Sequence, residues 1–295
     1  MRPDLQHIRF HGLVTAGAGR ARRLSASMTA RAAPLSFEQP VLAMGSLGRD
    51  VLWRSGLNPD AYRDAPVLRR TNACFRALRV SGDDEARQAI APGGDPLGRA
   101  LDTLLLGVSG FFRDPEVFDT LRAQVLPRLA SGGGALRVLS VGCSNGAELY
   151  SVAMLLDEAG ALERTRLVGL DCRASAIESA TRAIYPVEDA GMVPDALRTR
   201  MFQFTPDGVR VADHLRARAE FQVGDATASL PAGPWDLVLC RNLTIYLRTP
   251  VTDRLLEAIV ERLTPSGTLV LGRAERPAAS MPLVPVARCV YQRHG

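Results

Sequence analysis

The sequence contains few histidines and few cysteines, and both shortages restrict its chemistry. Of the four histidines, only His214 falls inside an expected domain, whereas the others lie near the chain ends. The five cysteines are widely spaced and form no C-x-x-C pair. A disulfide framework or a zinc site needs paired or clustered ligands. We therefore expect buried thiols, no metal site and no histidine acting as a general base.

Long apolar runs are missing as well. No stretch of ~18 or more apolar residues could span a membrane, and the first residues lack the apolar core of a secretory signal. We expect a cytoplasmic protein that does not insert into membranes. The net charge of +5 comes from arginine, which binds carboxylates and phosphates through two parallel hydrogen bonds. An acidic partner is therefore expected. The basic clusters are not interleaved with aromatic residues, so we expect no nucleic-acid partner.

Changes in composition divide the chain into three parts. Residues 1–43 are rich in Ala, Arg and Ser without sustained periodicity, which predicts a disordered or weakly structured tail, with a transit peptide as the alternative. Residues 44–108 have a helical pattern and predict a small basic helical domain. Residues 109–295 alternate strand-like and helix-like segments, with a small insertion expected at about 186–219.

The clearest helix of the basic domain is expected at 66–80. Its apolar residues recur at three- and four-residue spacing from Val67 to Leu78, which is typical of a helix that packs along one face. A second apolar helix is expected at 97–108, after a break rich in Gly and Pro. Basic residues near the opposite side of the first helix are Arg69, Arg76 and Arg79.

The remaining elements indicate an α/β fold with a doubly wound parallel sheet. Asp114-Pro115-Glu116 predicts the start of a helix, because Asp can cap the N–H groups and Pro suits the first turn. This helix is expected to end near Pro127. Further expected elements are strands at 136–141, 166–170, 221–223, 235–240 and 268–271, and helices at 148–158, 173–183 and 251–263. Such alternation is typical of a parallel sheet covered by helices on both faces.

A glycine-containing turn follows the first of these strands, from Gly142 to Gly146. Glycines allow close approach of a ligand, and the helix behind the turn offers free N–H groups. The spacing matches neither the G-x-G-x-x-G dinucleotide motif nor a phosphate-binding loop. Asp171 ends the second strand, where an acid can accept hydrogen bonds from a ribose diol, and Asp225 follows the third, where an adenine edge would be read. The series indicates an adenosyl ligand without a pyrophosphate, S-adenosylmethionine (SAM). Each feature alone has a structural alternative, a turn glycine or a strand-end cap.

Three motifs together resemble the CheR family, the chemoreceptor glutamate methyltransferases. They are Gly-Phe-Phe-Arg-Asp-Pro at 110–115, Gly-Cys-Ser-Asn-Gly-Ala-Glu-Leu-Tyr-Ser at 142–151 and Leu-Cys-Arg-Asn-Leu-Thr-Ile-Tyr-Leu at 239–247. The resemblance covers about residues 51–276 and not the tail. It implies a Rossmann-like class I SAM methyltransferase domain, preceded by a small all-α N-terminal domain, that methylates a carboxylate, a protein glutamate side chain.

The resemblance also implies roles for individual residues. Arg113 and Tyr246 are expected to be catalytic and to orient the acceptor carboxylate or the sulfonium; a helix-flanking salt bridge and a core-edge aromatic are their structural alternatives. The cofactor-binding residues are expected to be Ser109, Arg113, Gly142, Gly146, Glu148, Asp171, Asp225, Ala226, Arg241 and Asn242. The arginine face formed by Arg69, Arg76 and Arg79 is expected to bind an acidic, chemoreceptor-like helix, with a solvated surface as the alternative.

Several positions depart from the family pattern. Gly107 replaces an Asn, Ala147 a Glu and Arg173 an Asp, while Asp225-Ala226 replaces Asn-Leu. These changes remove polar partners from the expected cofactor site. Two alternatives therefore stay open, which are a methyltransferase for a small molecule or another protein, and a catalytically weak regulator that binds SAM.

Overall fold

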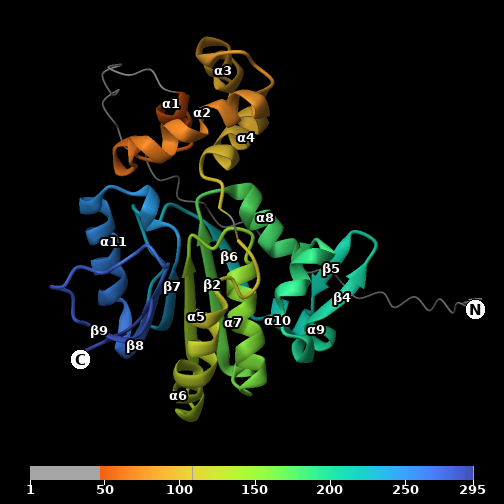
Figure 1. Ribbon diagram of the computed structural model, residues 1–295, viewed down its shortest axis with the longest axis vertical. Helices are drawn as coiled ribbons and strands as arrows, with labels where there is room; N and C mark the ends of the chain where they lie inside the picture. Colours follow the sequence, from red (N-terminus) through yellow and green to blue (C-terminus); the bar gives the residue numbers. More distant parts are fainter. Residues whose placement is uncertain (1–46, 108, 295) are drawn as a thin grey trace, which may run out of the picture. The chain divides into compact units, whose positions relative to one another are not determined.

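The computed structural model describes residues 47–107 and 109–294, and the predicted tail at 1–43 lies outside them. A seven-stranded sheet, in the order β6-β2-β1-β7-β8-β10-β9, forms the centre of the α/β part (Figure 1). Its parallel strands are β6 (Ala219–Val223), β2 (Thr165–Asp171), β1 (Leu136–Val141), β7 (Trp235–Cys240) and β8 (Leu263–Leu271). β10 (Val290–Arg293) runs antiparallel to β8 and to β9 (Leu283–Ala287). The predicted doubly wound fold is confirmed; β9 and β10 were not predicted.

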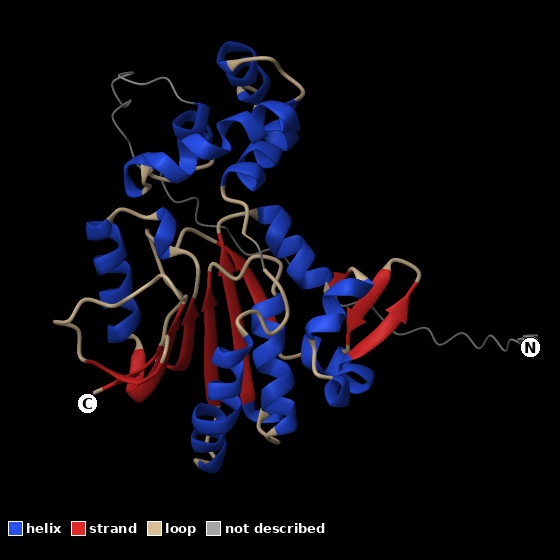
Figure 2. Ribbon diagram, viewed as in Figure 1, coloured by secondary structure: helices blue, strands red, loops and turns tan. Residues whose placement is uncertain are grey.

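Helices cover both faces of this sheet (Figure 2). Alternate residues of β1 point to opposite sides: Val138 packs in one core with α7 (Ala147–Glu158), and Leu139 packs in the other with α11 (Thr249–Glu261). The strands are continuous apolar runs because both of their faces are buried. α8 (Ala174–Arg182) lies in the chain between β2 and β6.

No helix among the described residues is both long and apolar enough to cross a bilayer.

The helix that begins after Asp114 is longer than predicted. α5 (Pro115–Thr120) continues through a π-helical turn, η2 (Leu121–Val125), into α6 (Leu126–Ser131). The prediction of an end near Pro127 is wrong, because Pro127 lies in the first turn of α6. The wider turn changes the hydrogen-bond pattern there, and a proline in a first turn loses no required N–H bond.

Short helices precede the sheet. They are α1 (Leu47–Arg54), η1 (Pro59–Ala61), α2 (Asp64–Leu78), α3 (Asp83–Ile90) and α4 (Gly94–Leu104). α2 begins at Asp64 rather than at Pro66, and Arg79 is its left-handed C-cap with φ 59°. α4 begins and ends earlier than the predicted 97–108. Buried Val51, Cys74 and Leu104 belong to the apolar core that these helices share with α11.

A second, three-stranded sheet overlaps the insertion predicted at about 186–219, and its first strand lies just before this stretch. Its order is β3 (Ile184–Tyr185), β5 (Gly208–Val211) and β4 (Phe202–Thr205). The accompanying helices are η4 (Val187–Met192), α9 (Asp195–Met201) and α10 (Asp213–Arg216). Phe111 packs edge-on against Tyr185 and Phe202 and so joins this small sheet to the Phe-Phe-Arg motif.

Candidate functional site

The carboxyl ends of the parallel strands bring the predicted site residues to one edge of the sheet. The chain leaves β1 toward β2 on one side, while β7 lies on the other side of β1. This arrangement creates a crevice at the point where the strand order reverses, the usual ligand site of open α/β sheets. Loops after β1, β2, β6 and β7 border it.

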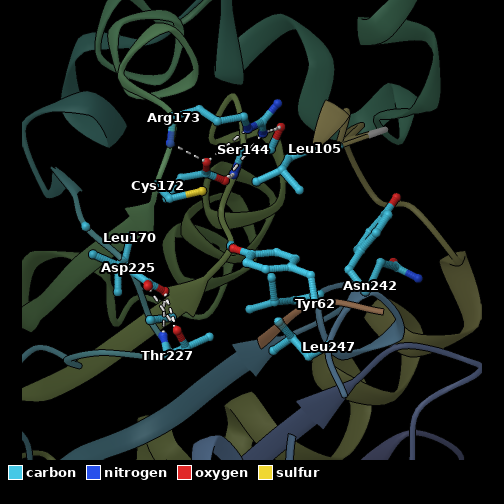
Figure 3. Close-up of a pocket in the computed structure, with 17 residues that line it drawn as sticks. Tyr62, Leu105, Ser144, Leu170, Cys172, Arg173, Asp225, Thr227, Asn242 and Leu247 are labelled. Atoms are coloured by element: carbon cyan, nitrogen blue, oxygen red, sulfur yellow. Dashed lines mark hydrogen bonds and ion pairs between the residues drawn. The ribbon is translucent and has the colours of Figure 1, made fainter. Parts of the chain in front are cut away.

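Two adjoining pockets occupy this edge. The first, which we call the acidic pocket, is lined by Asp171, Asp225 and their neighbours, together with Tyr62 (Figure 3). The second, the arginine pocket, is lined by arginines and by Ser109 and Glu148. The residues that line both pockets are Gly107, Gly142, Ser144, Asn242 and Tyr246. The pockets therefore form one continuous crevice.

The glycine turn closes tightly onto the end of β2. Gly142 (φ 70°) and Ser144 (φ 51°) have left-handed backbones. The N–H groups of Gly142 and Cys143 both donate to the Leu170 carbonyl, at 2.8 and 3.0 Å. The N–H of Ser144 donates to Asp171 Oδ2 at 2.9 Å. The turn uses these three N–H groups to attach itself to β2, and the free N–H groups predicted for the ligand belong to the helix behind it.

Gly146 lines neither pocket. It is the left-handed N-cap of α7 with φ 82°, and a Cβ there would lie 2.9 Å from both Ala180 Cβ and Phe221 Cζ. Glycine is needed at this position for close packing behind the turn. This packing explains the glycine without a ligand, and the contact of Gly146 with the cofactor stays a prediction.

Asp171 is buried and already carries several hydrogen bonds. Its Oδ1 accepts from the N–H and Nε of Arg173, at 3.0 and 3.1 Å. Arg173 Nη2 also donates to Ser144 Oγ at 3.0 Å. A Cβ on Gly107 would lie 3.1 Å from Ser144 Oγ and 3.2 Å from Arg173 Nη2. Two departures from the family pattern thus meet in space, since the missing side chain at Gly107 leaves room for Arg173.

Asp225 begins the loop after β6 and forms a local turn. Its Oδ1 accepts from the N–H and the hydroxyl of Thr227, both at 2.8 Å. Ala226 lines the same pocket. Cys172 also lines it, and burial, together with the nearby Asp171 charge, raises the pKa of its thiol to about 12. The acidic pocket therefore contains two carboxylates and a thiol that stays neutral.

Arg241 is the centre of a buried ion-pair network behind the arginine pocket. Only 1% of its side chain is exposed; its Nη1 donates to Glu148 Oε2 at 2.8 Å and its Nη2 to Asp114 Oδ2 at 2.6 Å. Nη2 also donates to the Arg113 carbonyl at 2.9 Å. Arg241 therefore connects the acid of the glycine turn to the Phe-Phe-Arg motif.

The predicted capping role of Asp114 is wrong. Its side chain makes no cap hydrogen bond, and its backbone is left-handed with φ 58°. The carboxylate instead pairs with Arg241 and, through Oδ1, with Arg273 Nε at 3.1 Å. An ion pair with a buried guanidinium takes precedence over a hydrogen bond to a backbone N–H that solvent can satisfy.

Glu275, which the sequence reasoning did not identify, anchors the loop after β7. This buried carboxylate accepts from the N–H groups of Asn242 (2.8 Å), Gly272 (2.6 Å) and Thr244 (2.7 Å), and from the Thr244 hydroxyl at 2.9 Å. Asn242 has a left-handed backbone with φ 60°. Glu275 therefore maintains the conformation of the loop that carries Asn242 and Tyr246. A lone Glu after a strand gives no sequence signal for this role.

Arg113, Ser109 and Tyr246 all line the arginine pocket, as does Arg70 from α2. Arg70 was not predicted. The sequence signal that could have identified it is its helical spacing. Arg70 follows Val67 by three residues and precedes Cys74 by four, so it lies on the same face of the helix as these apolar residues. A charged residue in an apolar stripe is a candidate for a buried or functional contact.

The predicted arginine face is separate from the crevice. Arg69, Arg76 and Arg79 are exposed and line neither the acidic nor the arginine pocket. Because α2 begins two residues earlier than predicted, it contains one acid, Asp64. That carboxylate pairs with Arg248 Nη2 at 3.1 Å and so does not neutralise this face.

Comparison with known proteins gives a consistent result. Residues 107–283 match the family described as CheR methyltransferase, SAM binding domain. Chemotaxis protein methyltransferase 2 of Pseudomonas aeruginosa is 32% identical over 256 residues, which cover 82% of this chain and 90% of that protein. The probable biofilm formation methyltransferase WspC of the same species is 32% identical over 228 residues, 75% of this chain and 54% of WspC. Chemotaxis protein methyltransferase 1 is 34% identical over 191 residues, 59% of this chain and 68% of that protein. The chain thus spans about half the length of WspC.

Proposed function

The chain belongs to the CheR methyltransferase family, and on this premise we propose that it transfers a methyl group from SAM to a carboxylate, a glutamate side chain of a protein. The observation that carries the proposal is the continuity of the two pockets. Gly142, Asn242 and Tyr246 line both the acidic pocket and the arginine pocket. A cofactor whose nucleoside lies in the acidic pocket can therefore extend into the arginine pocket and meet an anionic acceptor there.

The acidic pocket fits the adenosyl part of SAM. Asp171 and Asp225 offer acceptors for ribose and adenine, and no phosphate-binding lysine lines either pocket in the described part of the chain. We assign Asp171 to the ribose, and Asp225 with Ala226 to the adenine. Contacts to the amino-acid end would fall to residues of the arginine pocket, Ser109, Arg113, Glu148, Arg241 and Asn242, and Gly142 would let the cofactor approach the turn.

Bound SAM supplies an electrophilic methyl group, whose bond to sulfur breaks as the bond to the acceptor oxygen forms. An ionised glutamate is already a nucleophile, so no side chain has to remove a proton. The chain contributes alignment and exclusion of water, which can lower a barrier by up to ~7–11 kcal/mol for a well-oriented pair. Arg113 and Arg70 can hold the acceptor carboxylate, since both line the arginine pocket. Tyr246 lies at the junction of the pockets, where methyl transfer takes place.

The acceptor is a protein segment rich in acid, and a chemoreceptor-like helix meets that description. Arg69, Arg76 and Arg79 provide an exposed basic face on or next to α2, the helix that also brings Arg70 into the arginine pocket. An acidic helix bound there could place one glutamate near Arg70. We place this reaction in the cytoplasm.

Transfer of labelled methyl groups tests the proposal. The purified protein is incubated with [methyl-³H]SAM and cell extract, and the product is treated with base. A glutamyl methyl ester releases volatile methanol under these conditions, whereas an N-methyl group does not. Base-stable label would identify a different acceptor chemistry, and label in small molecules would favour a small-molecule acceptor.

Two variants test the catalytic assignments. At saturating SAM, Arg113→Ala and Tyr246→Phe should lower the single-turnover rate while the protein still binds S-adenosylhomocysteine (SAH), the demethylated product. Unchanged rates would remove both residues from the mechanism.

A specific feature favours a second candidate, a SAM-binding regulator with little turnover. Arg173 occupies three of the hydrogen bonds around Asp171, so less of the carboxylate remains for a ribose. Consumption of SAM separates the two functions, because a regulator binds SAM in cell extract without converting it to SAH.

A further inference from the structure

Tyr62, from the helical part of the chain, reaches into the acidic pocket. It lies between η1 and α2, is 5% exposed and lines this pocket. A β-bridge pairs Tyr62 with Leu247, and Arg63 N–H donates to the Tyr246 carbonyl at 2.8 Å. Arg248 Nε donates back to the Tyr62 carbonyl at 2.9 Å. The backbone around Tyr62 is therefore attached to the loop after β7.

The hydroxyl of Tyr62 points into the cavity. Figure 3 shows its ring across the pocket, with the oxygen directed toward the side that carries Cys172 and Asp225. Within residues 47–107 and 109–294, this hydroxyl makes no hydrogen bond. The residue is buried, but its hydroxyl opens into the pocket, where a ligand or water can supply the missing hydrogen-bond partner.

The two carboxylates of the pocket are more fully occupied. Asp171 accepts from Ser144 and Arg173, and Asp225 accepts from Thr227 through both oxygens. These internal bonds leave each carboxylate few acceptor positions for a ligand. The Tyr62 hydroxyl, in contrast, has its donor and its acceptor positions available.

The surroundings of Tyr62 also determine the protonation state of its hydroxyl. Burial first, and then the nearby Cys172, Asp225 and Asp171, raise its pKa well above the ordinary value. The hydroxyl therefore stays protonated over the physiological range and can donate a hydrogen bond.

We propose that Tyr62 binds the nucleoside of SAM through its hydroxyl, which makes the helical part of the chain a component of the cofactor site. This inference rests on the proposed function. A ribose hydroxyl can accept from the phenol while it donates to a remaining lone pair of Asp171. Such a bridge would compensate for the hydrogen bonds that Arg173 occupies at Asp171.

The test compares the full chain with its Tyr62→Phe variant, using SAH and 5′-methylthioadenosine as probes in titration calorimetry. Methylthioadenosine carries the nucleoside but not the amino-acid end. We expect both ligands to bind about three- to tenfold more weakly to the variant, the effect of losing one neutral hydrogen bond. The Tm without ligand should stay the same, because the hydroxyl has no protein partner to lose.

Tyr291→Phe is the matched control, since Tyr291 lies in β10 and lines neither pocket. It should leave both affinities unchanged. Equal binding of SAH by wild type and Tyr62→Phe would overturn the inference. So would weaker binding of SAH alone, because the contact would then lie at the amino-acid end. If the wild type binds neither probe, the proposed function fails instead.

Discussion

The substitution Glu275→Gln tests whether the loop after β7 depends on a buried carboxylate. Glu275 accepts four hydrogen bonds, from the N–H groups of Asn242, Gly272 and Thr244 and from the Thr244 hydroxyl. Glutamine has the same shape but only one acceptor oxygen. Its NH₂ group must therefore face at least one of these donors.

The smallest loss places the amide nitrogen at the Oε1 position. The Thr244 hydroxyl can rotate to accept, but the Thr244 N–H loses its partner, which costs ~1–3 kcal/mol when it is buried. The two bonds to Oε2 lose their charge assistance, about 1 kcal/mol each. Removal of a buried charge offsets part of this sum. We expect the free energy of unfolding to fall by about 2–4 kcal/mol, and the Tm by roughly 5–12 °C.

We expect Glu275→Gln to lower the rate of methyl transfer as well as the stability. The bond that is lost holds the Thr244 N–H, two residues before Tyr246 in the same loop, and the bond that holds the left-handed backbone of Asn242 is weakened. A displacement of ~1 Å at a reacting group can cost about 100-fold in rate. We therefore expect the single-turnover rate to fall at least tenfold at a temperature where the variant is folded.

Thermal unfolding followed by circular dichroism, together with single-turnover transfer from labelled SAM, measures both effects. Glu261→Gln is the control, because Glu261 is exposed at the end of α11. It should change neither quantity. If Glu275→Gln melts within about 2 °C of wild type, a shift below 1 kcal/mol, the reasoning is refuted.

Three further predictions concern the crevice and the arginine face. Asp171→Ala should weaken SAH binding by about 10- to 100-fold, the loss of a charge-assisted hydrogen bond; a change within about twofold would contradict the ribose assignment. The double variant Arg69→Glu and Arg76→Glu should reduce methylation of the acceptor most strongly at low salt, with unchanged SAH affinity; equal methylation across a salt series would make this face a plain surface. The Cys172 thiol, with a pKa raised to about 12 by burial and by Asp171, should stay protonated at pH 8. Its alkylation by iodoacetamide, followed by mass spectrometry, should be slow and slower still with SAH. Because the pKa of this thiol is higher in the folded protein than in the unfolded chain, its contribution to the free energy of unfolding should be lost only as the pH rises from about 9 toward 12. Rapid labelling of Cys172 at pH 8 would contradict the prediction that its thiol is buried and protonated.

The sequence alone determined the five parallel strands of the central sheet, in their order along the chain, and the edge of the sheet at which the candidate site lies. The strands at 136–141 and 235–240 have the predicted bounds, because a buried parallel strand is a continuous apolar run bounded by turns. Asp171 and Asp225 end or follow such strands, so parallel pairing brings them to one edge. The bounds of a strand and the residues at its end depend on neighbours in the chain, so the local pattern of apolar and polar residues predicts them.

Only the tertiary structure decided which side chains complete the site. Arg63 bonds to Leu247, 184 residues away, and this contact places Tyr62 over the acidic pocket. Arg241 bonds to Asp114 across 127 residues, so the acid expected to cap a helix serves an ion pair instead. Partners this distant come together through the closure of the whole fold, and the energy of a buried pair depends on its surroundings rather than on its neighbours in the sequence.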